Sequence, residues 1–158
     1  MSEESRKIGR IVVGVDGSAG SRGALRWALD LAGLTGGEVD VVAAWTLGGH
    51  LEWTTRMTNY GLITLPETPG REDVQAAVEG SVAEMVAAAA GSAEPDQVTR
   101  QVHEGRATAV LLDAAAAADL LVLGRRGHSG LAAALLGSVS RHCVDHASCP
   151  VVVVPADE

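Results

Sequence analysis

The stretch Leu120-Leu121-Val122-Leu123-Gly124-Arg125-Arg126-Gly127, followed after nine residues by Gly137-Ser138-Val139-Ser140, decides the fold of this chain. The first four residues form an apolar run typical of a buried strand, and the last four begin a helical pattern. Glycines let a ligand approach backbone N–H groups closely, and a helix start presents unpaired donors with partial positive charge. A strand, a glycine-containing loop and a helix start therefore predict a phosphate-binding site.

The same alternation of strand and helix begins near the amino terminus. Residues 11–15 are an apolar, largely β-branched run, which predicts a buried parallel strand that leads into the turn Asp16-Gly17-Ser18. Ser18 or Ser21 can cap the helix that follows. That helix places apolar residues on one face and ends at a glycine pair; the residues concerned are Leu25, Ala28, Leu29 and Ala32, with Gly36 and Gly37 after them.

Four further strands and three further helices complete the series. The strands are predicted at residues 39–45, 98–103, 120–123 and 151–154, and the helices at 74–89, 107–118 and 138–147. Strands that alternate with helices indicate an α/β fold, an open parallel sheet with right-handed crossovers. Ligands of such sheets bind beyond the carboxyl ends of the strands, where the turns that carry Asp16 and Gly124 both lie.

The length of the chain, 158 residues, fits a single domain. We expect a flexible tail at residues 1–8, the domain at 9–155 and a short tail at 156–158. Residues 46–70 contain several glycines and prolines with no sustained period, so they are expected to form a long variable loop within the domain.

Composition and charge narrow the possible partners. Hydrophobic residues make up 47% of the chain but aromatic residues only 3%, with no Phe, so Val, Leu and Ala must build the core. The formal net charge of −8 argues against nucleic acid or an anionic membrane as the main partner. No apolar run reaches membrane-spanning length and the first ten residues are polar, so a cytoplasmic protein with reduced thiols is expected.

The pattern Gly-x2-Gly-x9-Gly-Ser after the fourth strand resembles that of the universal stress protein family. Supporting matches are the segments at residues 13–18, 118–124 and 149–155. The resemblance implies a single-domain five-stranded sheet of order 3-2-1-4-5 with helices on both faces, a Rossmann-like arrangement of the adenine nucleotide alpha hydrolase-like type. It also implies a homodimer formed through the last strand, that is, through Val151, Val152, Val153 and Val154.

The intact glycine pattern resembles the ATP-binding branch of that family. By this resemblance the expected ligand is ATP, or AMP or cyclic AMP, with Mg²⁺ as a possible companion of ATP. The residues that it maps to the nucleotide are Val15, Asp16, Ala44, Leu123, Gly124, Arg126, Gly127, Gly137, Ser138, Val139 and Ser140.

Several of these residues have a second, structural interpretation. Asp16 can accept hydrogen bonds from ribose hydroxyls, or it can simply stabilise the turn in Asp-Gly-Ser. Ser138 and Ser140 can donate to phosphate oxygens or act as helix caps. Arg125 and Arg126 can clamp a phosphate or lie solvated on the surface. Trp45 can lie over a base or form part of an apolar plug.

Three functions stay open at this point. The first is a homodimeric nucleotide-binding sensor with a role in stress response and little or no catalysis. The second is a slow ATP hydrolase, which is disfavoured because Lys7 is the only lysine and no Gly-Lys-Ser/Thr is present. The third is a structural dimer without a ligand.

Two histidines and two cysteines near the end of the chain have a spacing that superficially resembles that of metal ligands. His142 and His146 lie four residues apart on one predicted helix. Cys143 points off the face that the histidines share, and Cys149 lies at the start of a strand. No metal site is therefore predicted from this group, and no residue of the chain points to a particular protein partner.

Overall fold

The computed structural model describes residues 7–47, 70–90, 96–125 and 136–156, which form five strands and four helices. In chain order these are β1 (Arg10–Gly14), α1 (Ala19–Thr35), β2 (Glu38–Trp45), α3 (Arg71–Ala90), β3 (Val98–Glu104), α4 (Ala107–Ala115), β4 (Leu120–Gly124), α5 (Ser138–His146) and β5 (Val151–Val154).

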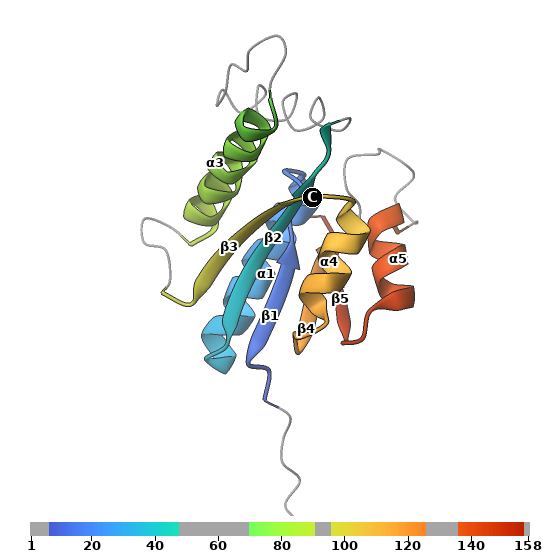
Figure 1. The fold of residues 1–158 in the computed structure, drawn as a ribbon. Coiled ribbons are helices and arrows are strands. Elements are labelled where there is room, and N and C mark those ends of the chain that lie inside the picture. Colours follow the sequence, from blue (N-terminus) through green and yellow to red (C-terminus); the bar gives the residue numbers. More distant parts are fainter. Residues whose placement is uncertain (1–6, 48–69, 91–95, 126–135, 157–158) are drawn as a thin grey trace, which may run out of the picture.

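All five strands are parallel and lie in the order β3-β2-β1-β4-β5 (Figure 1). The predicted fold class and strand order are therefore confirmed. β1 lies at the centre, because Ile11, Val12 and Val13 are fully buried and can face apolar layers on both sides of the sheet. The pairing of β1 with β4 also brings the carboxyl ends of these two strands next to each other at one edge of the sheet.

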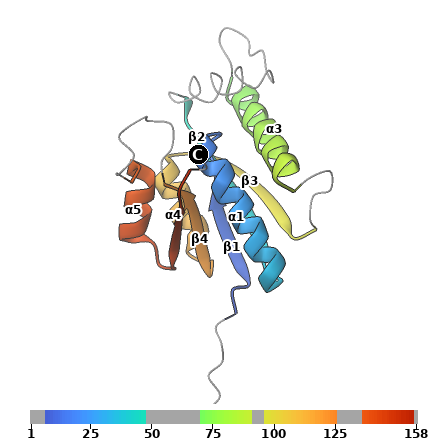
Figure 2. The ribbon, with the colours of Figure 1, turned by 180° about the vertical axis from the view of Figure 1, so that it is seen from behind.

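Helices cover both faces of the sheet. Alternate residues of a strand point to opposite faces, and Val13 accordingly packs in the core beneath α1 and α3, whereas Val12 packs in the core beneath α4 and α5. Figure 2 shows α1 in front of β1 when the molecule is seen from behind. Among the described helices, none combines the length and the apolar character that crossing a membrane requires.

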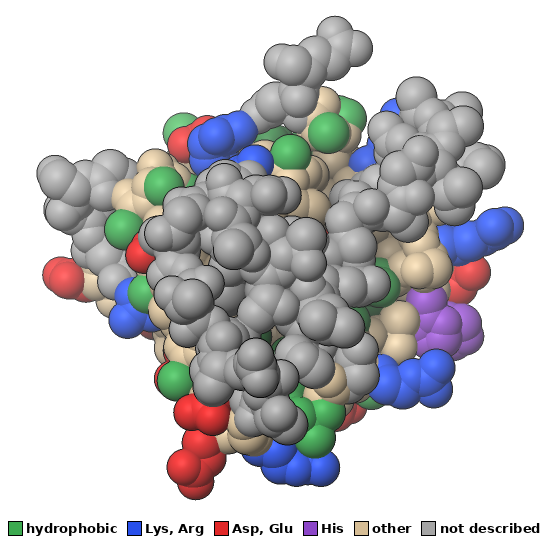
Figure 3. Space-filling view, turned by 90° about the horizontal axis from the view of Figure 1, so that it is seen from above, with side chains coloured by type: hydrophobic (Ala, Val, Ile, Leu, Met, Phe, Trp, Pro, Cys, Tyr) green, Lys and Arg blue, Asp and Glu red, His purple; other side chains and the backbone are tan. Residues whose placement is uncertain are grey.

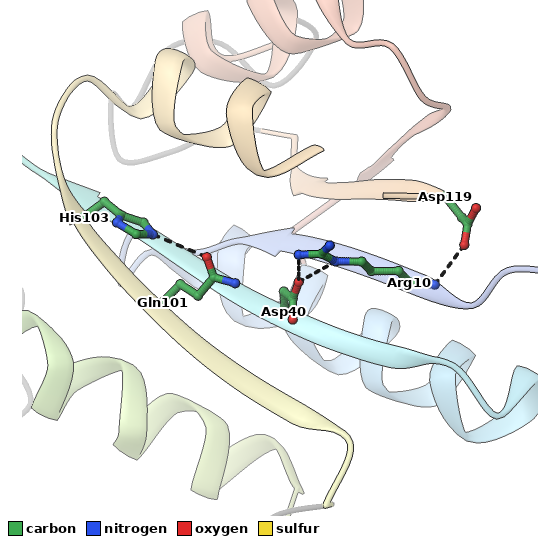
Figure 4. Close-up of polar contacts among 5 residues, drawn as sticks. All are labelled: Arg10, Asp40, Gln101, His103 and Asp119. Atoms are coloured by element: carbon green, nitrogen blue, oxygen red, sulfur yellow. Dashed lines mark hydrogen bonds and ion pairs between the residues drawn. The ribbon is translucent and has the colours of Figure 1, made fainter. Parts of the chain in front are cut away.

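The amino edge of the sheet is closed by hydrogen bonds within the chain (Figure 4). Asp119 Oδ2 accepts the backbone N–H groups of Gly9 and Arg10, both at 2.9 Å, so the carboxylate ties the start of β4 to the start of β1. The Arg10 guanidinium in turn pairs with the buried Asp40 carboxylate of β2 at 2.7 Å. These bonds fix the register of three strands at the edge opposite the glycine loop.

Several predicted boundaries were wrong by one to three residues, among them the start of α3, predicted at residue 74 and observed at Arg71. The helix predicted at residues 107–118 ends at Ala115, and the Ala118 N–H group instead donates to the Ala115 carbonyl. The chain turns here because the next N–H group, of Asp119, donates to the Arg10 carbonyl as β4 approaches β1. The first strand ends at Gly14 rather than Val15, although the Val15 N–H group still donates to the Val42 carbonyl.

Trp45 lies in the core beneath α1 and α3, and its indole N–H donates to Gln75 Oε1. Of the two interpretations of this side chain, the apolar plug is therefore the one that the structure supports. The aromatic residues within the 46–70 segment lie outside the described residues.

Candidate functional site

The loop after β1 is held by a closed set of hydrogen bonds. Asp16 Oδ1 accepts the Ser18 N–H group at 2.9 Å, and Ser18 Oγ accepts the Ser21 N–H group at 3.2 Å. The Ser21 hydroxyl is buried; it accepts the Asp16 N–H group at 3.3 Å and donates to the Ser18 carbonyl at 3.0 Å. Asp16 therefore has the turn-stabilising role that its Asp-Gly-Ser context allows, and this role fixes its backbone at the carboxyl edge.

Gly124, at the end of β4, touches the start of α1. A Cβ atom on this glycine would lie 2.7 Å from the Gly20 carbonyl carbon and 2.8 Å from its oxygen, closer than a carbon atom can approach. The sequence suggested that Gly124 gives a ligand access to the backbone. The structure shows a second reason for a glycine here, because the end of β4 and the first turn of α1 can come this close only without a side chain.

The start of α5 is tied to the ends of β4 and β5. The Gly137 N–H group donates to the Arg125 carbonyl at 2.8 Å, and the Arg125 N–H group donates to the Val154 carbonyl at 2.8 Å. The Ser140 hydroxyl donates to the Gly124 carbonyl at 2.7 Å. These bonds place Gly124 and Arg125 next to the start of α5 at the carboxyl edge.

The first turn of α5 presents backbone donors that the helix itself does not use. The first bond of the helix runs from the Arg141 N–H group to the Gly137 carbonyl, so the N–H groups of Ser138, Val139 and Ser140 precede it. Gly137 is the N-cap residue, at φ −62° and ψ 159°, and no side chain among the described residues caps this helix. The first turn carries no acidic residue either. Such a helix start attracts an anion.

Ser140 differs from its expected role as a hydroxyl donor to phosphate. Its side chain is only 4% exposed, and its hydroxyl hydrogen is directed to Gly124, so the hydroxyl holds α5 against β4. Its backbone N–H group is the part that stays at the open helix start. Ser138, by contrast, is exposed, and its hydroxyl has the accessibility that the sequence interpretation requires.

The remaining residues mapped to the nucleotide are distributed between the core and the edge. Val15 is buried, and the Leu123 side chain packs in the core against Gly14, so only their backbone groups can face a ligand. Ala44 is half-buried near the end of β2, and Val139 is half-buried against the core beneath α4 and α5. Arg126 and Gly127 lie outside the described residues.

Figure 3 views the molecule from the side of the carboxyl edge, and basic, acidic and histidine side chains lie around the outline in this view. β5 forms one border of the sheet, and its four valines are all half-buried. The predicted edge position of this strand is therefore confirmed. α1 and α5 both contact β5, and each carries an exposed apolar residue, Trp27 and Val144 respectively.

The cysteine and histidine residues of α5 face different environments, as predicted. Cys143 is buried, and burial raises the pKa of its thiol, whereas His142 and His146 are exposed. In the part of the chain that the structure describes, no cluster of three or more His, Cys, Asp or Glu side chains is positioned to hold a metal ion.

Sequence reasoning missed one residue of this edge, Gly20. The signal was present, because Gly20 lies in the first turn of a helix next to Ser21, where a small residue is not needed for helix formation. What the sequence does not contain is its partner, Gly124, more than one hundred residues away. Only the pairing of β1 with β4 brings the two glycines into contact.

A parallel sheet of order 3-2-1-4-5 with helices on both faces and an open helix start at its carboxyl edge defines a doubly wound α/β protein. The family model described as the universal stress protein family matches residues 7–155. The chain therefore belongs to the universal stress protein family.

Individual relatives agree with this assignment. A universal stress protein of Mycolicibacterium smegmatis is 30% identical over 155 residues, which cover 94% of this chain and 48% of that protein. The chain thus spans about half the length of the curated relatives that it matches. The universal stress protein UspA from Lactobacillus plantarum matches with a TM-score of 0.70 at 19% identity, covering 95% of this chain and 99% of that one.

A universal stress protein from Archaeoglobus fulgidus, solved in complex with dAMP, has a TM-score of 0.61 at 21% identity. The match covers 94% of this chain and 98% of that chain. At this level of identity the likeness establishes a shared fold.

Proposed function

We propose that this chain binds an adenine nucleotide at the carboxyl edge of its sheet and acts as a homodimeric, ATP-responsive sensor in the cytoplasm, with little or no catalysis. One observation carries the proposal. The uncapped start of α5 is tied to the end of β4, and the end of β4 in turn touches the first turn of α1, so that three segments meet at the carboxyl edge next to one set of backbone donors.

The phosphate end of the nucleotide fits the start of α5. The N–H groups of Ser138, Val139 and Ser140 supply donors, and the helix dipole adds partial positive charge at the same point. Gly137 places no side chain over these donors. In a protein with a formal net charge of −8, such local backbone donors are the means by which a polyanion can be held.

The adenosine end fits the loop after β1 and the end of β2. The hydrogen bond from Val15 to Val42 holds this loop along β2, and Ala44, two residues further along β2, has a small half-buried side chain. Asp16 lies on the same loop, where a carboxylate can accept ribose hydroxyls while Ser18 fixes its orientation. The dAMP complex of the A. fulgidus protein, which shares this fold, supports an adenine nucleotide as the ligand.

Binding rather than hydrolysis follows from the groups present. Rapid phosphoryl transfer requires a positioned lysine or base together with carboxylates that hold metal ions. The glycine loop contains no lysine, and the Asp16 carboxylate already accepts a backbone N–H group. If Mg²⁺ accompanies ATP, we expect it to be held by phosphate oxygens and water more than by side chains of this edge.

The homodimer is proposed to form through β5. Among the described residues no strand pairs with the outer side of β5, whose four valines are half-buried, and edges of this kind are usually paired or covered. A second copy of the same strand can pair with that side.

The decisive experiment is calorimetric titration of the full-length protein with ATP, AMP and cyclic AMP, each with and without Mg²⁺, after any co-purified nucleotide has been identified by denaturation. The matched variants are Gly137→Glu and Gly137→Gln, which add side chains of equal size with and without a negative charge. We expect Gly137→Glu to abolish binding and Gly137→Gln to weaken it.

Two results would overturn the proposal. One is the lack of any co-purified nucleotide together with no titration heat from the three ligands. The other is an unchanged affinity in Gly137→Glu. Phosphate release is measured in parallel. If the protein hydrolyses ATP, and Asp16→Ala abolishes turnover while nucleotide binding is retained, the slow hydrolase replaces the sensor as the proposed function.

A further inference from the structure

The carboxyl-terminal half of α5 carries a pair of exposed histidines that the nucleotide site does not use. His142 and His146 lie four residues apart, so their side chains emerge from the same face of the helix one turn apart. Their ring centroids are 4.2 Å apart and the ring planes differ by 19°. Figure 3 shows histidine side chains on the surface at the side of the molecule where α5 lies.

The orientation of His146 is fixed by a hydrogen bond within the helix. Its Nδ1 atom lies 2.9 Å from the His142 carbonyl oxygen. Because a carbonyl oxygen can only accept, Nδ1 is the nitrogen that carries the proton in this bond. In the neutral ring, the lone pair is then on Nε2. A ring nitrogen that donates to a backbone carbonyl while the other is left for coordination is the usual arrangement of a metal-bound histidine.

We propose that His142 and His146 chelate one divalent transition-metal ion, of the class of Cu²⁺, Ni²⁺ or Zn²⁺. A metal–imidazole bond is about 2.0–2.1 Å long, so an ion bound to both rings holds the two nitrogens roughly 3–4 Å apart. In this structure the two rings are stacked, with centroids 4.2 Å apart and planes that differ by 19°, so their lone pairs, which lie in the ring planes, do not converge on one point. Chelation therefore requires the exposed His142 side chain to rotate until its free nitrogen faces Nε2 of His146, while His146 keeps its hydrogen bond to the His142 carbonyl.

The position of the pair on the helix favours a cation. His146 is the last residue of α5, where the unpaired carbonyl groups and the helix dipole carry partial negative charge. The chain as a whole has a formal net charge of −8. Imidazole ligands suit copper, nickel and zinc, and the general order of stability predicts Cu²⁺ as the tightest of the three.

The site is independent of the neighbouring thiol and has open coordination positions. Cys143 follows His142 in the sequence but is buried on the side of α5 that faces the sheet. Within the described ranges no third His, Cys, Asp or Glu side chain joins the two histidines in a metal-binding cluster. Water or an external ligand would therefore complete the coordination of the ion, which sets this surface chelate apart from a closed structural zinc site.

The test is a calorimetric titration of the tag-free full-length protein with NiCl2 and with CuCl2 in a buffer that does not bind metals. Variants are His142→Ala, His146→Ala and the double variant. His103→Ala is the matched control, because His103 is also exposed but lies on β3. Each single variant is expected to lower the affinity by about tenfold or more, since the second ring is supplied at high effective concentration. His103→Ala should bind as the wild type does.

A spectroscopic measurement on the wild-type protein tests metal binding without relying on the stability of the variants. In ¹⁵N spectra of the imidazole rings, addition of ZnCl2 should shift the His142 and His146 resonances together. The proposal fails if the double variant binds Ni²⁺ as tightly as the wild type, or if only one of the two single variants changes the affinity. It also fails if ZnCl2 moves the resonances of other histidines and leaves these two in place.

Discussion

Helices α1 and α5 both begin at the carboxyl edge of the sheet, but their first turns are satisfied in different ways. In α1 the Ser18 side chain accepts the Ser21 N–H group, and the Asp16 carboxylate closes the turn before it. In α5 the N-cap residue is Gly137, and among the described residues no side chain takes up the donors of the first turn.

This difference separates the structural from the ligand-binding part of the edge. A helix start that its own side chains cap is stabilised without a partner, whereas an uncapped start gains most from an external anion. Asp16 and Gly124 therefore have structural roles that exist without nucleotide, and the start of α5 is where the nucleotide would add most. Four predictions test this comparison, from the largest expected effect to the smallest.

The contact between Gly124 and Gly20 should be the most sensitive point of the edge. Gly124→Ala would place a Cβ atom 2.7 Å from the Gly20 backbone, which no side-chain rotation can relieve. We expect the free energy of unfolding to fall by about 3 kcal/mol, the upper range for overpacking.

The matched control for this variant is Gly80→Ala on α3, where an added Cβ would meet nothing within 4 Å. Replacing a glycine inside a helix by alanine should raise the stability by about 0.5–1 kcal/mol. Urea denaturation of both variants measures the difference. Equal effects in the two proteins would contradict the close contact.

Capping the open helix should have opposite effects on binding and stability. In Gly137→Asp the new carboxylate can accept the N–H groups of the first turn of α5, and it repels phosphate from the same place. Nucleotide affinity should fall by more than tenfold, about 1.4 kcal/mol. The stability of the ligand-free protein should rise by a few tenths of a kcal/mol.

Gly137→Asn provides the comparison, because it can cap the helix without adding a charge. Calorimetry with ATP and thermal unfolding without it give the two readouts. A variant Gly137→Asp that binds ATP as the wild type does would show that the donors of α5 are not the phosphate site.

Removing the cap of α1 should cost stability. Ser18→Ala leaves the Ser21 N–H group without its acceptor, and a loss of about 1 kcal/mol in unfolding free energy is expected. Ser138→Ala at the start of α5 removes an exposed hydroxyl and should change the stability by less than about 0.5 kcal/mol. Chemical denaturation distinguishes the two, and a larger loss in Ser138→Ala would reverse the comparison between the helices.

Because Cys143 lies on the buried face of α5, it should affect the free energy of unfolding at alkaline pH. Burial raises the pKa of the Cys143 thiol above its ordinary value of 9.0. The unfolded chain therefore loses this proton at a lower pH than the folded chain does, so the contribution of the thiol to stability decreases as the pH rises above about 9.

Cys143→Ala should remove this part of the alkaline decline and leave the rest unchanged. The measurement is the free energy of unfolding of both proteins from pH 7 to pH 10. If the two curves stay parallel above pH 9, the thiol is not buried in the way that the structure shows.

Most of the fold could be predicted because each strand and helix has a recognisable pattern of apolar residues within its own stretch of sequence. The apolar run at residues 120–123 and the run at 11–15 indicate buried parallel strands on their own. The end of α4 could not be predicted, because residues 116–118 are alanines that continue a helical pattern well. They leave the helix because the Asp119 N–H group and carboxylate bind the start of β1, and that strand lies far away in the sequence.

The sequence predicts a site at the carboxyl edge, and the structure adds the contacts that some of its residues make there. The spacing of Gly124, Gly137 and Ser138 indicates an edge site because glycines and a helix start have intrinsic properties that any fold preserves. The role of the Ser140 hydroxyl could not be predicted, because a hydroxyl can donate a hydrogen bond either to a ligand or to a neighbouring carbonyl. Its distance of 2.7 Å to the Gly124 carbonyl decided between the two.

The sequence by itself determined the alternation of strands and helices, the apolar character of the core and the glycine at the start of α5. These are properties of residues and their near neighbours along the chain. Only the tertiary structure decided that Gly124 must lack a side chain to meet Gly20, and that the Ser140 hydroxyl holds α5 to β4. The contact between Gly124 and Gly20 joins segments far apart in the chain, so it exists only when the pairing of β1 with β4 brings them together. The bond from Ser140 to Gly124 forms only when α5 packs against the end of β4.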